Sequence, residues 1–132
     1  MTLKAIVQWL KTLDPALDGC IAAGGIDGNQ EKFVGVYDAK SSGSSRICVG
    51  GKESTVYDSK QITLLIHWTK SEFQAEAKAQ ELWEKLYGLC GISIGDVPVI
   101  SVDPGNGPTS VGKDAYGICE YVINVKIYYE RT

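Results

Sequence analysis

The sequence contains one histidine, His67, and four cysteines, and none of these five residues lies close to another along the chain. Zinc-binding motifs bring Cys and His ligands together at short, regular spacing. Cys20, Cys48, Cys90 and Cys119 show neither a CxxC pair nor such spacing. The sequence therefore predicts no metal site, and we expect the four cysteines to be reduced thiols.

The chain also lacks a dense basic stretch and a long apolar run. It has 13 Lys and Arg against 16 Asp and Glu, for a formal net charge of -3. A chain without a basic stripe has little to bind phosphates, which disfavours direct, sequence-specific nucleic-acid binding. Lys4, Gln8 and Lys11 interrupt the apolar residues near the start, so we expect no signal peptide, no membrane span and an intracellular origin.

The composition is that of a globular protein, with 44% hydrophobic and 22% charged residues in 132. A chain of this length buries about two-thirds of its unfolded surface in one core. We expect a single domain over residues 1–132. Residues 39–60 are rich in Ser, Gly and charge, which predicts a mobile loop within that domain.

Two segments have helical spacing of apolar residues. Residues 3–13 follow Thr2, a suitable N-cap, and stop at Asp14-Pro15 because a residue before proline avoids helix. Thr69 and Glu72 have the spacing of a capping box, which predicts a second helix that begins there and ends near Gly88.

Five segments have strand character. Residues 20–23 and 32–38 predict a hairpin, and residues 61–68, 97–102 and 117–131 predict three further strands. The resulting order is α-β-β-β-α-β-β, which is too irregular for a doubly wound parallel sheet. We therefore predict an α+β fold with a mostly antiparallel sheet and two helices packed on one face.

Alternation along the strands assigns their two faces. Ile62, Leu64 and Ile66 share one face with the apolar residues of the last strand, where the helices are expected to pack. The opposite face, left for solvent or a partner, is expected to carry polar side chains. Those side chains are Thr63, His67, Glu120 and Lys126.

Four candidate chemical sites have simpler explanations. Gly107–Lys113 reads GPTSVGK, with P-loop spacing, but Asp114 replaces the metal-binding Ser or Thr, so a turn-rich loop explains it better. His67 could act as a general base, but no pattern completes a triad, which favours a strand-face histidine. Residues 27–29 lack the ligand spacing of a calcium loop. Asp96, Asp103 and Asp114 could form a carboxylate pair, but solvated turns explain them better.

The C-terminal part of the chain resembles a known family. Val111-Gly112-Lys113-Asp114 is followed by Tyr116-Gly117, Glu120-Tyr121 and Asn124. This run resembles the C-terminal signature of tailed-phage tail-terminator and minor capsid proteins, and the upstream order of elements is similar to theirs over nearly the whole chain. The long Ser/Gly segment and Lys113, where Arg is commoner, depart from the family pattern.

The resemblance implies a virion structural protein without catalytic residues or a cofactor, assembled in the cytoplasm of a bacterial host. It implies a ring, commonly a hexamer, that caps the tail tube and contacts tail-tube and head-completion proteins. Val111, Gly112, Lys113 and Asp114 are the expected contact residues, and Asp114 either pairs with a neighbouring subunit or holds its own turn. A head-completion or other minor capsid protein is one alternative, and a small nucleotide- or ligand-binding enzyme domain using the Gly107–Asp114 loop is another.

Overall fold

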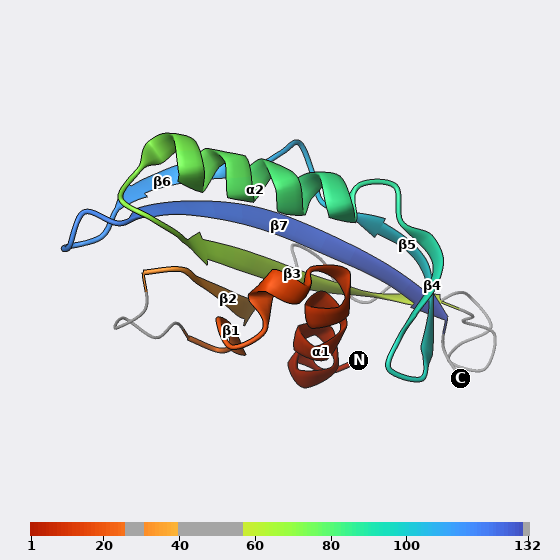
Figure 1. Ribbon diagram of the computed structural model, residues 1–132. Helices are drawn as coiled ribbons and strands as arrows, with labels where there is room; N and C mark the ends of the chain where they lie inside the picture. Colours follow the sequence, from red (N-terminus) through yellow and green to blue (C-terminus); the bar gives the residue numbers. More distant parts are fainter. Residues whose placement is uncertain (26–30, 40–56, 131–132) are drawn as a thin grey trace.

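A computed structural model describes residues 1–25, 31–39 and 57–130 of the chain (Figure 1). Two α-helices and one short 3-10 helix accompany a seven-stranded sheet within these residues. In chain order the elements are α1 (Leu3–Leu13), η1 (Pro15–Leu17), β1 (Ile21–Ala23), β2 (Phe33–Asp38), β3 (Tyr57–His67), α2 (Glu72–Leu86), β4 (Cys90–Ile94), β5 (Val97–Asp103), β6 (Thr109–Lys113) and β7 (Cys119–Glu130).

Both helices cover the same face of the sheet. Figure 1 shows α2 lying along β7 and α1 lying below it. Ile6 and Leu10 of α1, Leu82 of α2, and Ile66 and Ile123 of the sheet share one buried cluster. The predicted α+β fold, with its mostly antiparallel sheet and two helices on one face, is confirmed.

The sheet has the order β1-β2-β3-β7-β5-β4, and β6 also pairs with β7. All of its pairs are antiparallel except β1 with β2, which run parallel. The predicted hairpin over residues 20–38 is therefore wrong. The 3-10 helix turns the chain into β1, with Cys20 N–H donating to the Leu17 carbonyl, and β2 then docks alongside in the same direction through Val34 N–H and the Cys20 carbonyl.

The start of α1 was predicted correctly, whereas the start of α2 was predicted too early in the chain. The Thr2 hydroxyl accepts the Ala5 N–H at 3.2 Å, as an N-cap should. The second helix starts after Ser71, whose hydroxyl accepts the Gln74 N–H, so the predicted Thr69 cap is wrong. Thr69 still pairs with β7, because its carbonyl accepts the Cys119 N–H at 3.1 Å and holds the backbone extended.

The structure adds two strands to those predicted. Residues 90–94 form β4, and Thr109–Lys113 form β6 rather than a loop. The predicted loop over 39–60 is wrong for residues 57–60, which begin β3, and its residues 40–56 lie outside the described part. The candidate calcium loop at 27–29 also lies outside it. Among the described helices, none combines the length and apolar character needed to cross a membrane.

Candidate assembly edge

β5 and β6 form one interrupted strand along the same side of β7. Asp103 pairs with Lys126 and Thr109 pairs with Val122, so β6 continues the line of β5 after a short excursion. That excursion starts at Pro104 and ends at Pro108, and proline cannot donate a hydrogen bond to a ladder. The prolines therefore divide the edge into two segments.

The outer edges of the two segments differ. β4 pairs with the outer edge of β5, from Cys90 opposite Ser101 to Ile94 opposite Val97. In the described part of the chain, the only strand that pairs with β6 is β7. All five residues of β6 are exposed, and Val111 has 55% of its surface accessible. An unpaired strand edge with an exposed apolar side chain is a template for pairing with another chain.

The turn from β6 to β7 is organised by Asp114. Its Oδ1 accepts the Tyr116 N–H at 2.9 Å and the Ile118 N–H at 3.0 Å. Its own N–H donates to the Ile118 carbonyl, and its carbonyl accepts from Gly117, which has a positive φ of 80°. Of the two roles expected for Asp114, the structure therefore displays the one in which the side chain holds its own turn.

Asp114 also contacts the single histidine. His67 Nε2 lies 2.8 Å from Asp114 Oδ2, and His67 is only 1% exposed. Because an ionised carboxylate can only accept, the Nε2–H group of His67 donates a hydrogen bond to Asp114 Oδ2. The histidine hydrogen bond, with the two backbone amides, lowers the pKa of Asp114 below its ordinary value.

This contact corrects the expected position of His67. Alternation placed its side chain on the open face, available to solvent or a partner, whereas the turn at Asp114 covers it. Nδ1 of His67 is buried without a hydrogen-bond partner in the described residues. Because its N–H donates to the carboxylate that holds the turn, His67 is a structural part of that turn. Asp114 precedes β7, the strand that lies beside β3 in the sheet, but 47 residues separate it from His67, so no local pattern in the sequence indicated the contact.

The first turn of α2 lies close to β6. Tyr121 of β7 is paired with Ser110 of β6 in the sheet. Burial raises the pKa of Tyr121, and the carboxylates of Glu76 and Glu72 on α2 raise it further. The neighbouring Phe73 is 86% exposed. Figure 1 shows β6 and the start of α2 at the same end of the molecule. That end therefore combines an open strand edge with the acidic side chains of Glu72 and Glu76 and the exposed apolar side chains of Phe73 and Val111.

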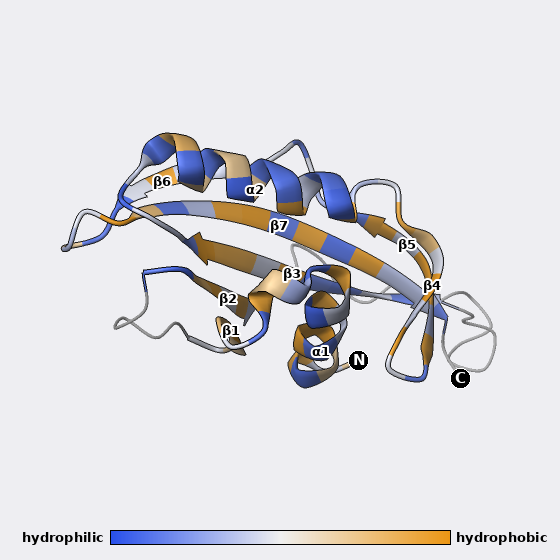
Figure 2. Cartoon of the chain, viewed as in Figure 1, coloured by the Kyte–Doolittle hydropathy of each residue, from blue (hydrophilic) through white to orange (hydrophobic). Residues whose placement is uncertain are grey.

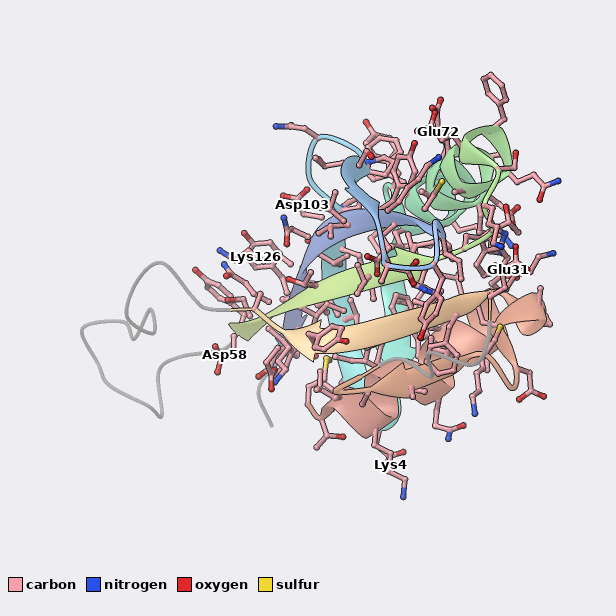
Figure 3. The ribbon with its side chains drawn as sticks, turned by 90° about the vertical axis from the view of Figure 1, so that its left-hand side faces the viewer. Lys4, Glu31, Asp58, Glu72, Asp103 and Lys126 are labelled. Carbon is pink, nitrogen blue, oxygen red and sulfur yellow. The ribbon has the colours of Figure 1, made fainter. Side chains whose placement is uncertain are left out.

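The other candidate carboxylates lie apart from this edge. Asp96 is exposed in the turn between β4 and β5. Asp103 accepts the Gly105 N–H at 3.0 Å and lines a hollow of about 260 Å³ with Asn124 and Lys126. Figure 3 shows Asp103 and Lys126 on the face opposite the helices. Nowhere in residues 1–25, 31–39 and 57–130 do three His, Cys, Asp or Glu side chains form a group that could hold a metal ion.

A buried ion pair between the helices was missed in the sequence. Lys78 Nζ of α2 lies 2.5 Å from Asp14 Oδ2, just after α1, and these residues are 7% and 2% exposed. Lys85 lies 3.5 Å from the other Asp14 oxygen. Burial acts to raise the pKa of Asp14, but Lys78 and Lys85 lower it below its ordinary value. The sequence predicted only that Asp14-Pro15 ends the first helix, and it gave no indication of this second role of Asp14.

No protein-family model matches the chain, and no curated protein matches its sequence.

Proposed function

We propose that this chain is a structural protein of a phage or prophage virion that forms a ring, caps the tail tube and joins it to the head. The observation that carries the proposal is the position of Val111, Gly112 and Lys113. These residues lie on β6, an exposed strand whose outer edge pairs with no other described strand. A protein that assembles through its own edges needs such a surface.

The order of elements also supports this function. The resemblance to tail terminators is carried by the segment that forms β6, its turn and the first half of β7. An N-terminal helix, a strand that ends at His67 and a following helix precede that segment. A rigid sheet covered by helices on one face presents its edges in fixed positions, as a closed ring requires.

The role proposed for this protein is not catalytic. The His67 side chain is 1% exposed and is committed to Asp114, so it is poorly placed to reach a substrate. The P-loop-like segment forms an edge strand, whereas a phosphate cradle needs a loop that opens a helix. The proposed partners are further copies of the chain, commonly six in a ring, the tail-tube protein and a head-completion protein. Their assembly in the host cytoplasm would place the chain in the virion.

Ring formation tests the function directly. The purified protein is expected to form rings as its concentration rises, seen by light scattering and electron microscopy, with or without tail-tube protein. Particles that remain monomeric at high concentration even with tail-tube protein would contradict the proposal. Capture of a head-completion protein without tail-tube protein would instead assign the chain to the head side of the junction.

The substitution Val111→Lys sharpens this test. A lysine on an open edge opposes strand addition, so we expect the variant to stay monomeric where the wild type forms rings. Ile100→Lys is the matched control, because Ile100 is 44% exposed on β5, whose outer edge β4 already occupies. Circular dichroism establishes that both variants fold. Equal ring formation by the two variants would rule out β6 as the contact.

A further inference from the structure

We propose that β6 of one copy pairs with β1 of the next, so that a single sheet continues from subunit to subunit. This inference rests on the proposed ring and names the two surfaces that build it. Among the strands that the structure describes, both lie at edges of the same sheet, β1 at one side and β6 at the other. In a head-to-tail ring each copy contributes two different surfaces, as these edges are.

The two edges lie at the same level of the sheet. Following the paired residues across the strands, Ile21 lies beside Val34, Val34 beside Ile66, Ile66 beside Tyr121, and Tyr121 beside Ser110. This row therefore crosses five strands from β1 to β6 without an offset. The adjacent row is formed by Ala22, Gly35, Leu65, Val122 and Thr109.

A closed ring requires that β6 and the β1 that it contacts lie at the same height along the strand direction. If β6 met a β1 displaced along the strand direction, each added subunit would step along the axis and an open helix would result. Here Ser110 of one copy can face Ile21 of the next while every row stays level. Rotation about an axis parallel to the strands then closes the assembly.

The strand directions agree with that rotation. β1 runs parallel to β2, and each step from β2 to β3, β7 and β6 reverses direction. β1 and β6 therefore run in opposite directions within one copy. A rotation about an axis along the strands preserves both directions, so β6 and the neighbouring β1 meet as an antiparallel pair, the pairing used by most of this sheet.

In the same register, the proposed contact also brings a positive side chain of one copy close to a negative side chain of the next. Continuing the rows past the bulge at Ser110–Gly112 places Lys113 beside residue 19 of the next copy, one residue from Asp18. Lys113 is exposed, and the Asp18 side chain is 80% exposed, with one long 3.9 Å pair, to Lys11, among the described residues. A parallel arrangement would instead place Lys113 beside Ala23, next to Gly24 and Gly25, none of which carries a charge.

Cysteine pairs test this contact in the whole protein. Thr109→Cys and Ala22→Cys place thiols on the row that would meet across the interface, in a background with Cys20, Cys48 and Cys90 changed to Ser. Directly opposed residues of antiparallel strands have Cβ atoms about 5 Å apart, within reach of oxidation or a short bis-maleimide. The double variant is expected to yield a ladder of covalent oligomers.

The single variants supply the controls. Mixed together they should give covalent dimers and nothing larger, and each alone should remain uncrosslinked. Crosslinking of Thr109→Cys alone would show that β6 pairs with itself, and rings without any crosslink would show another interface. Either result overturns this inference and leaves the proposed function intact, whereas absence of rings with tail-tube protein present contradicts both.

Discussion

Two carboxylates of this protein hold buried nitrogen groups, but they do so in different surroundings. Asp14 is 2% exposed and lies between two lysines of α2, so both partners of its closest pair are inside the fold. Asp114 holds the buried His67 from the surface side, with 24% of its own side chain exposed. The first pair joins helix to helix, and the second joins β3 to the turn beside the open edge.

Because of this difference, Asp14 is expected to stabilise the whole fold, whereas Asp114 is expected to shape the turn beside the β6 edge. A buried charge is costly when its partner is removed, because nothing replaces the lost solvation. A carboxylate at the surface keeps access to water, so its loss affects mainly the local backbone that it holds. We therefore expect changes at the Asp14 pair to affect global stability and changes at Asp114 to affect the β6–β7 turn.

Lys78→Met is expected to have the largest effect. It leaves the Asp14 carboxylate buried with only the more distant Lys85, and loss of one partner of a buried pair costs about 3 kcal/mol. Urea unfolding followed by circular dichroism measures this loss. The control Asp14→Asn combined with Lys78→Met removes both charges and should recover part of the stability. A double variant no more stable than Lys78→Met would show that the stranded charge is not the cause.

The pH dependence at Asp114 is expected to be smaller. Its pKa is lowered from the ordinary 3.8 in the folded state, so the native protein binds fewer protons than the unfolded chain near and below that value. The stability that Asp114 contributes is therefore complete above about pH 3.8 and is lost as pH falls through the lower folded pKa. In Asp114→Asn this component is absent.

Urea unfolding of the wild type and Asp114→Asn between neutral pH and about pH 2 measures this component. The difference in unfolding free energy between the two proteins should shrink towards acid pH. A difference that stays constant over this range would mean that ionisation of Asp114 contributes nothing. His67→Phe removes the hydrogen bond that lowers the pKa of Asp114 most, so it should reduce the pH dependence while the two turn amides remain.

Local patterns predicted the α+β class because apolar periodicity and the Thr2 cap are encoded within a few residues. The direction of β1 could not be predicted in this way, since it is set by the turn at Leu17 and by pairing with residues of β2. Cys90–Ile94 was missed because a five-residue edge strand with a glycine carries a weak alternation signal.

The candidate edge was located by sequence but described wrongly. Glycine and proline around Thr109–Lys113 indicated a loop, and only the paired β7 reveals a strand. The Asp14–Lys78 and Asp114–His67 contacts span 64 and 47 residues, so no local pattern could predict them. The contact with the turn at Asp114, 47 residues away, is also what buries His67.

The smallest effect concerns the thiol of Cys119, which reports on the turn without unfolding the protein. Cys119 is 2% exposed and pairs with Lys113 at the start of β7. Asp114→Ala removes the acceptor of the Tyr116 and Ile118 amides, so the turn should open more often and maleimide should modify Cys119 several-fold faster. Cys20, beside the opposite edge, should keep its rate. Mass spectrometry of timed samples gives both rates, and equal acceleration at the two cysteines would indicate global unfolding, which would place Asp114 with Asp14 among the residues that hold the whole fold.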